Sequence, residues 1–262
     1  MKSSDRMQEQ EQTSATAAHA PFLSLFKLRN FRLLWIGEAI SVIGDQFYLI
    51  ALPWLVLQLT GDALVMGTVL ALAAVPRALF MLLGGALTDR FSPRVVMLVS
   101  NLARMFLVLL LAGLVLTGAV EIWMIYLLAL LFGLADAFFY PAQSAIVPRL
   151  VADDQLQPAN ALMQGTWQLS LFAGPVLAGF LITVMAGDPA AAAGTDLRGI
   201  GFAFIFDALT FLASALTLWF VNDSANVQHE QGFAVDDESL LSAIVAGLRA
   251  MWQDVSLRTF FI

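Results

Sequence analysis

Six stretches of this chain are each about 20 or more residues long and strongly apolar, which leaves few folds open. A helix needs roughly 20 apolar residues to cross a bilayer, where every backbone polar group must be bonded within the protein. We place the stretches at residues 31–57, 63–87, 95–116, 122–142, 159–185 and 201–221. The composition, 60% hydrophobic and 13% charged, is far from that of a soluble domain. The sequence therefore predicts an all-α membrane protein with a six-helix transmembrane bundle over residues 31–221.

The basic residues indicate how the bundle is oriented. Arg198 is the only Lys or Arg on one side of the predicted helices, and Arg77 and Arg104 lie inside them. All others fall on the opposite side: Lys2, Arg6, Lys27, Arg29, Arg32, Arg90, Arg94, Arg149, Arg249 and Arg258. Cytoplasmic loops carry an excess of Lys and Arg, so we expect both ends of the bundle in the cytoplasm. We therefore expect an integral protein of the plasma or inner membrane with a cytoplasmic N-terminus.

The segments outside the bundle are polar or amphipathic. Residues 1–30 are too weakly apolar for a signal peptide and are predicted to form a cytoplasmic tail. Residues 222–238 are predicted to form a cytoplasmic loop. Apolar residues at helical spacing over residues 239–262 predict an amphipathic helix at the membrane surface that runs into the start of a truncated seventh transmembrane helix. The alternative is a C-terminal interfacial anchor.

A short charged run, residues 84–94, separates the second and third predicted helices and is interpreted as a cytoplasmic loop. Within it, Gly85 would allow close helix approach, Asp89 could face a helix N-terminus, and Arg90 and Arg94 could pair with acids or lipid headgroups. This pattern of glycine, acid and two arginines resembles the signature loop of the major facilitator superfamily. The family usually has a glycine at position 92 and a basic residue at position 93, where this chain has Ser and Pro. The alternative is a loop held only by its positive charges.

Other segments strengthen the resemblance and narrow it. Residues 40–45, 51–57 and 138–151 resemble the branch of macrolide-type drug exporters and the enterobactin exporter. The fifth predicted helix carries residues similar to the antiporter motif of the superfamily: Gly165, Gly174, Pro175 and Gly179.

The resemblance implies an architecture and a partner. The six helices would form two inverted three-helix repeats and make up half of a twelve-helix fold, so the C-terminal half of the same transporter would be the partner. Pro76 and Pro175 occupy corresponding positions of the two repeats, where each can kink its helix. The signature loop would latch the two halves together during transport.

Ionisable residues inside the predicted helices are candidates for function, because a charge in the membrane is costly unless it is paired or hydrated. The acids are Glu38, Asp45, Asp136 and Asp207, and the bases are Arg77 and Arg104. The surplus of acids suits proton exchange or a cationic substrate.

Each of these acids has an expected role. Asp45 lies near the membrane midplane, where it could couple protons or contact substrate, with a structural ion pair to Arg104 or Arg77 as the alternative. Asp136 is expected to pair with Arg90 or Arg94 and so to join the conformational switch. Glu38 is close enough to the cytoplasmic rim to reach water, and Asp207 is expected near the outer vestibule or capping a backbone turn.

The sequence argues against an enzyme. There is no Cys, the two His residues lie in the predicted tails, and no phosphate-binding Gly-x-x-x-x-Gly-Lys loop is present. We therefore expect no metal, cofactor or nucleic-acid partner.

The resulting interpretation is a secondary active transporter that works by alternating access. It would export a small amphipathic compound, such as a drug or siderophore, in exchange for protons across the lipid bilayer. Two alternatives remain: an uncoupled transporter of an anionic lipid or metabolite that uses Arg77 and Arg104, or a non-transporting truncated half.

Overall fold

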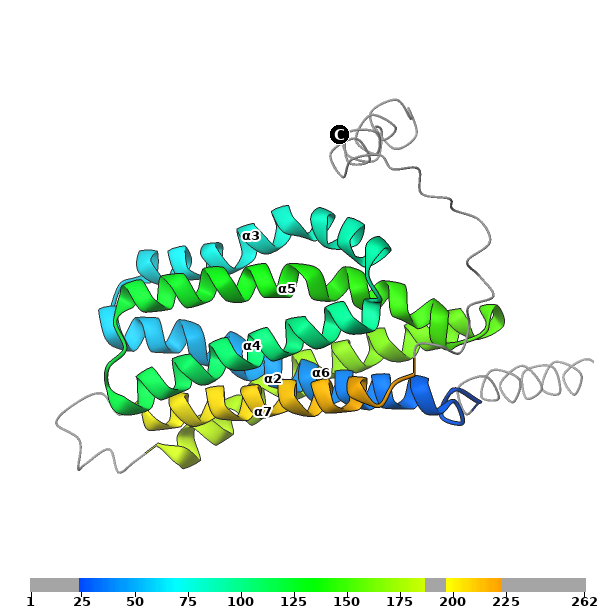
Figure 1. Cartoon of the computed structure of the whole chain (residues 1–262). Helices are drawn as coiled ribbons and strands as arrows, with labels where there is room; N and C mark the ends of the chain where they lie inside the picture. The colour runs from blue at the N-terminus through cyan, green and yellow to red at the C-terminus, as the bar shows by residue number, and fades with distance from the viewer. Residues whose placement is uncertain (1–23, 187–196, 223–262) are drawn as a thin grey trace, which may run out of the picture. The chain divides into compact units, whose positions relative to one another are not determined.

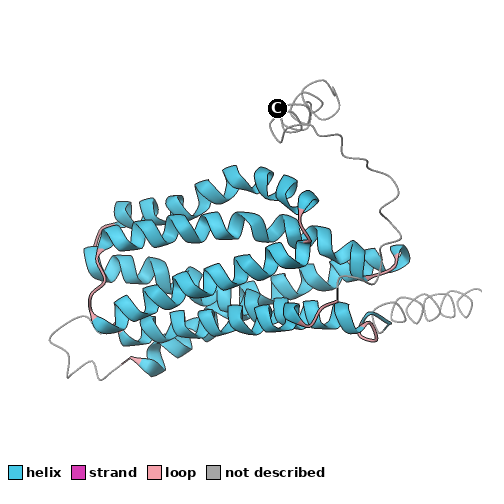
Figure 2. Ribbon diagram, viewed as in Figure 1, coloured by secondary structure: helices cyan, strands magenta, loops and turns pink. Residues whose placement is uncertain are grey.

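The computed structural model describes residues 24–186 and 197–222. Six long helices fill this part of the chain (Figure 1): α2 (Arg29–Thr60), α3 (Ala63–Arg90), α4 (Pro93–Thr117), α5 (Ile122–Leu150), α6 (Leu156–Met185) and α7 (Arg198–Trp219), with a 3-10 helix η1 (Asp153–Gln155) before α6. Figure 2 shows helices and loops and no strand among these residues. Each long helix is long and apolar enough to cross a membrane. The predicted fold class is confirmed. Most of the predicted tail (residues 1–30) and loop (residues 222–238), and all of the predicted amphipathic helix (residues 239–262), lie outside the described residues.

The helices alternate in direction. Helices α2, α4 and α6 begin at one end of the bundle, which we call the base, and α3, α5 and α7 begin at the other end, the top. The contacts agree with this alternation. Asn101 of α4 meets Ser214 of α7 while Arg94 meets Leu218, so these two helices are antiparallel. The base is the right-hand end of the bundle in Figure 1.

The packing repeats between the two helix triplets α2–α4 and α5–α7. The first helix of each triplet packs in parallel against the second helix of the other: α2 against α6, and α5 against α3. It also packs in antiparallel fashion against the third helix of the other triplet: α2 against α7, and α5 against α4. This exchange symmetry is that of two inverted three-helix repeats. Pro76 and Pro175 lie inside α3 and α6, the middle helices of the two triplets.

All six long helices extend beyond the predicted stretches at one end or both, and the ends of α5 and α3 change the interpretation of the sequence. Helix α5 continues past residue 142 to Leu150 and includes Pro141 and Pro148. Its last turns bury Ile146 and Val147 in an apolar cluster at the base, and this burial keeps the segment helical despite the prolines. Helix α3 continues to Arg90, and α4 begins at Pro93, a residue suited to the first turn of a helix. The interpretation of residues 84–94 as a loop is therefore corrected: only Phe91 and Ser92 link the two helices.

The buried apolar residues lie mainly between α2, α4, α5 and α7. Helices α3 and α6 are the least buried of the six, and their outer faces carry large apolar side chains such as Leu79, Phe172 and Phe180. An apolar outer surface is what a bilayer requires of a spanning helix.

Glycine allows the closest helix contacts. A Cβ atom added at Gly133 of α5 would lie 2.1 Å from the carbonyl oxygen of Ala73 in α3. At Gly44 of α2 it would lie 1.9 Å from Oγ1 of Thr210 in α7. Real Cβ atoms do not approach other atoms so closely. These helix pairs can therefore lie this close together only because residues 133 and 44 have no side chain.

The Gly133→Ala substitution should destabilise the bundle, because the new methyl group must push apart the backbones of α3 and α5. We expect a loss of about 1–3 kcal/mol, measured by thermal unfolding of the detergent-purified protein. Gly113→Ala is the matched control, since Gly113 lies in α4 with no described atom within 4 Å of its Cβ position. Equal melting temperatures for the two variants would contradict the close packing of α3 on α5.

Candidate functional site

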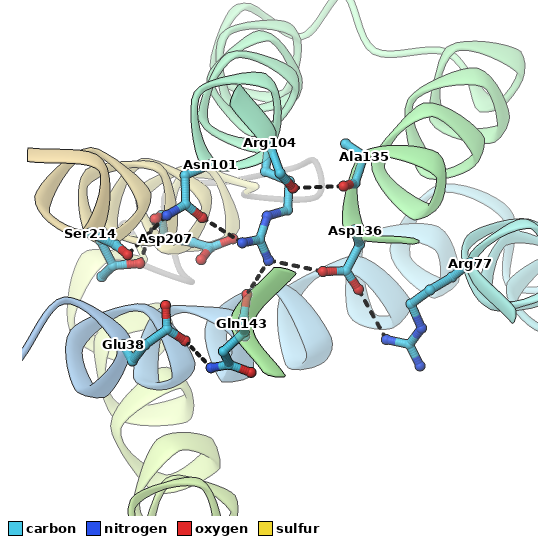
Figure 3. A network of polar contacts seen from close by, with 12 residues as sticks. Glu38, Arg77, Asn101, Arg104, Ala135, Asp136, Gln143, Asp207 and Ser214 are labelled. Atoms are coloured by element: carbon cyan, nitrogen blue, oxygen red, sulfur yellow. Dashed lines mark hydrogen bonds and ion pairs between the residues drawn. The ribbon is translucent and has the colours of Figure 1, made fainter. Parts of the chain in front are cut away.

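Arg104 of α4 lies at the centre of a polar network inside the bundle (Figure 3), and its side chain is 1% exposed. Its Nη1 lies 2.9 Å from Oδ1 of Asp136 in α5, and its Nη2 donates a hydrogen bond to Oδ1 of Asn101 one turn earlier in α4. Asn101 in turn donates to Oγ of Ser214 in α7, at 2.9 Å. The network therefore connects three helices through one buried guanidinium group.

Aromatic rings hold this guanidinium on two sides. Its Cζ lies 4.1 Å from the ring centre of Phe139 in α5 and 4.5 Å from that of Phe211 in α7. Cation–π contacts of this kind gain strength where water is excluded. The rings thus fix the plane of Arg104 and keep water away from its ion pair.

Asp136 binds both intramembrane arginines. Its Oδ2 lies 3.2 Å from Nη1 of Arg77 in α3, while Oδ1 contacts Arg104. The expectation that Asp136 pairs with Arg90 or Arg94 is wrong in this structure. Asp136 comes three helical turns before the basal part of α5, so its carboxylate meets the arginines at mid-depth instead.

Asp45 of α2 is the third acid near Arg104. Its Oδ1 lies 4.0 Å from Nη1 of Arg104, and its side chain is 28% exposed. This contact supports the alternative stated above, in which Asp45 forms a structural ion pair with Arg104. At 4.0 Å the distance between the two atoms is long for an ion pair. Asp45 is therefore held less firmly than Asp136 and remains accessible to small molecules.

Two cavities meet at Asp45. The basal cavity, of about 470 Å³, lies between α2, α5 and α6 and reaches from Glu38 and Asn160 up to Asp45. The upper cavity, of about 420 Å³, lies between α2, α3, α5 and α6 and reaches from Asp45 up to Leu70. Both are lined by Val42, Asp45, Tyr140 and Trp167. These four residues form the shared wall of the two cavities.

The two cavities differ in charge. Glu38 and Asp45 line the basal cavity, and no Lys or Arg is among the described residues that line it. The upper cavity contains Arg77 together with Asp45 and Asp136. Both volumes fall in the range of small-molecule binding sites, which are mostly apolar with a few placed polar groups.

Glu38 of α2 is buried, which corrects the expectation that it reaches water at the rim. Its side chain accepts a hydrogen bond from Nε2 of Gln143 in α5, and its Oε1 has no hydrogen-bond partner among the described residues. Residue 38 faces the basal cavity because it lies two turns before Asp45 on the same face of α2.

The residues of the charged run lie at the base, apart from the Arg104 network. Arg94 of α4 donates from Nε to the carbonyl oxygen of Leu218, at 2.9 Å, and from Nη2 to that of Trp219. It thereby satisfies carbonyl groups at the end of α7 that have no partner within the helix. Arg90 is exposed at the end of α3, and the side chain of Asp89 lies outside the described part of the chain.

Close helix contact in this region involves Gly84 and not Gly85. A Cβ at Gly84 would lie 2.6 Å from the carbonyl oxygen of Ala137 in α5, whereas no described atom lies within 4 Å of the Cβ position of Gly85. The one-residue difference follows from the helical conformation of this segment, which turns Gly84 toward α5. The expected role of Gly85 in helix approach is therefore corrected.

The residues that resemble the antiporter motif lie on α6. A Cβ at Gly174 would lie 2.3 Å from Cγ of Gln46, so this glycine allows α6 to pack on α2. Gly165 and Gly179 have no described atom within 4 Å of their Cβ positions. Pro175 follows Gly174 inside the helix. Of these glycines, Gly174 makes the close contact in this structure.

Several polar partners were not singled out from the sequence. Asn101 precedes Arg104 by three residues, and Gln143 follows Asp136 by seven, so both share a helix face with a charged residue. That spacing could have revealed them. Asp207 was expected near the outer vestibule or capping a turn, but its side chain is completely buried between α7 and α2.

Known proteins with related sequences include membrane transporters. The chain is 28% identical to Macrolide efflux protein A of Streptococcus pyogenes over 160 residues, 59% of this chain and 38% of that protein. It is 29% identical to Multidrug efflux pump Tap of Mycolicibacterium fortuitum over 230 residues, 84% of this chain and 51% of that protein. The chain thus spans about half, or less, of the length of these relatives.

The sequence model of the Major Facilitator Superfamily matches residues 34–262. This match and the efflux proteins among the relatives confirm the predicted family and its drug-exporter branch. Because the matched residues make up most of the chain, the chain belongs to the Major Facilitator Superfamily.

Proposed function

We propose that this chain supplies one six-helix half of an exporter that works by alternating access. The complete transporter would combine this half with a second, C-terminal half, and would move a small amphipathic compound, such as a drug or siderophore, out of the cell in exchange for protons. Relatives named as efflux proteins, which are about twice as long as the matched segment or longer, support this proposal.

The position of Asp45 carries the proposal. Alternating access requires a group that can be reached from one side of the membrane and then from the other. Asp45 lies in the wall shared by the basal and upper cavities, with part of its side chain exposed. A proton or substrate bound there could enter through one cavity and leave through the other.

Arg104 provides the means to couple protonation to conformation. Opposite charges 4 Å apart attract each other by about 4 kcal/mol at an effective dielectric constant of about 20. The ionised Asp45 is therefore drawn toward Arg104, and a proton on Asp45 removes this attraction. Proton entry down the gradient would then supply free energy, with each charge that crosses the potential worth about 2.3 kcal/mol per 100 mV.

The composition of the basal cavity favours an amphipathic substrate. Trp35, Tyr140 and Trp167 provide aromatic surface, while Gln164 and Asn160 provide amide groups along the same walls. Such a lining can bury an apolar body and satisfy a few polar groups on it.

The basal residues would control the switch between states. Arg94 joins the start of α4 to the end of α7, and Arg90 stands exposed beside the two-residue link. We propose that Gly85, Asp89, Arg90 and Arg94 act at the cytoplasmic rim. The base would then face the cytoplasm, as the distribution of basic residues favours. Asp136 would contribute from within the membrane by holding Arg104 in place.

The Asp45→Asn substitution in the complete transporter should abolish the dependence of export on the pH gradient, because the amide cannot carry the proton. Transport in membrane vesicles with and without an uncoupler measures this dependence. Asp62→Asn is the matched control: Asp62 is exposed before α3, where it accepts a hydrogen bond from the backbone N–H of Leu64 that Asn can also accept. Gradient-dependent export by the Asp45 variant would remove Asp45 from the coupling role.

A second candidate function is the transport of an anionic lipid or metabolite without proton coupling. The observation that favours it is Arg77, which lines the upper cavity with 47% of its side chain exposed.

The Arg77→Gln substitution separates the two functions. Asp136 keeps Arg104 as a partner in this variant, so its buried carboxylate is not left without a counter-charge and the fold should be retained. We expect export of a neutral or cationic compound to continue, measured as substrate efflux from loaded vesicles. Loss of transport in a variant that remains folded by circular dichroism would favour the anionic substrate.

A further inference from the structure

Asp207 of α7 is a buried acid that has no role in the proton coupling proposed above for Asp45 and Arg104. Its side chain is 0% exposed, and among the described residues the hydroxyl group of Thr210 is the only hydrogen-bonding group beside its carboxyl oxygens, which are otherwise unpaired. Oγ1 of Thr210 lies beside the carboxyl group, but it donates its proton to the backbone carbonyl oxygen of Asp207, at 2.7 Å. A buried polar group with so few partners is costly and calls for an explanation.

The carboxyl group of Asp207 lies against α2, next to Asp45. A Cβ at Gly44 would lie 2.8 Å from Oδ1 of Asp207, so the absence of a side chain at residue 44 creates the space that this carboxyl group occupies. Asp45 is the next residue along α2. The two acids therefore lie on facing helices at the same depth of the bundle.

Few other charged groups lie around Asp207. Asp45 of α2, Arg104 of α4 and Asp136 of α5 interact electrostatically with its carboxyl group. The phenol group of Tyr48 in α2 interacts electrostatically with Asp207 and Asp136. Helix α6, which also packs against α7, carries no charged residue. Among the described residues, Arg104 is therefore the cation that can act as counter-ion to Asp207.

In this structure Arg104 is engaged by other groups. Its two terminal nitrogens contact Asp136 and Asn101, and its buried Nε has no partner among the described residues. An ionised Asp207 would thus be a buried and uncompensated charge, which costs several kcal/mol. The arrangement is stable if the carboxyl group of Asp207 holds a proton while Arg104 is held by Asp136.

We propose that Asp207 is a second proton-carrying group of the transporter, which exchanges its proton with Asp45 and takes Arg104 as its counter-ion when it is ionised. In the exchange, the O–H bond at Asp207 breaks and an O–H bond forms at Asp45, so the total charge is unchanged. Asp45 then connects Asp207 to either cavity. This proposal rests on the proton-coupled export proposed above and adds a proton to its cycle.

Infrared spectroscopy of the purified complete transporter tests the proton on Asp207 without any need for transport. A protonated buried carboxyl group gives a carbonyl stretching band that Asp207→Asn should remove. In the wild type this band should decrease as the pH rises, and Asp45→Asn should shift the pH at which it does so, because the two acids interact. A band of Asp207 that is constant across the pH range in the wild type would overturn the proposal, as would a spectrum unchanged by Asp207→Asn.

Transport stoichiometry supplies the functional arm. Asn mimics a permanently neutral carboxyl group in size and hydrogen bonding, so it would satisfy a purely structural role at this position. We expect Asp207→Asn to lower the number of protons moved per substrate while substrate binding is retained, and Asp62→Asn to leave both unchanged. An unchanged stoichiometry in Asp207→Asn would overturn the proposal. If export by the wild type proved independent of the pH gradient, the proposal of proton-coupled export would fail. The infrared titration would still show whether Asp207 binds and releases a proton.

Discussion

The structure depends on one buried positive charge, the guanidinium group of Arg104. Removing such a charge from water is costly, and the cost is offset only if its hydrogen bonds and its counter-charge are supplied nearby. Asp136 supplies the counter-charge, Asn101 accepts a hydrogen bond, and the rings of Phe139 and Phe211 lie against the guanidinium group. Helices α4, α5 and α7 must therefore keep their relative positions for the charge to remain compensated.

The same charge explains why the acids of the bundle behave differently. Asp136 lies within hydrogen-bonding distance of Arg77 and Arg104 and acts as a fixed partner. Asp45 lies farther from Arg104 and touches both cavities, and in the described part of the chain Asp207 has only the hydroxyl group of Thr210 beside its carboxyl oxygens. A change in the proton bound by either of these two acids alters the balance around Arg104. In our account, this balance links proton binding to the side from which the cavities are open.

Much of the fold follows from the sequence, because a bilayer imposes a minimum length and an apolar composition on each spanning helix. The six helices could be predicted in this way, whereas the family was predicted from the resemblance of the motif around Asp89 and Arg90. The ends of α3 and α5 could not. Helix α5 continues to Leu150 because its last turns are buried in an apolar cluster, and α3 continues to Arg90 beyond its apolar stretch.

The pairing of charges was the least predictable part of the site. A sequence shows that Asp136 and the arginines lie in or near the membrane, but not how each helix is rotated about its axis. That rotation turns Asp136 toward Arg77 and Arg104 and turns Arg94 toward the end of α7. It also brings Asp207 against Gly44, which becomes visible only when α7 is packed on α2.

We propose that the wall around Asp45 is reached from both sides of the membrane in turn. The chain contains no cysteine, so Val42→Cys introduces a single thiol in this half of the protein, within the wall shared by the two cavities. A membrane-impermeant thiol reagent can then be added to one side of sealed vesicles at a time. Alternating access at this wall predicts labelling from both sides, with substrate or the pH gradient shifting the balance between them. Labelling from one side alone under all of these conditions would contradict it.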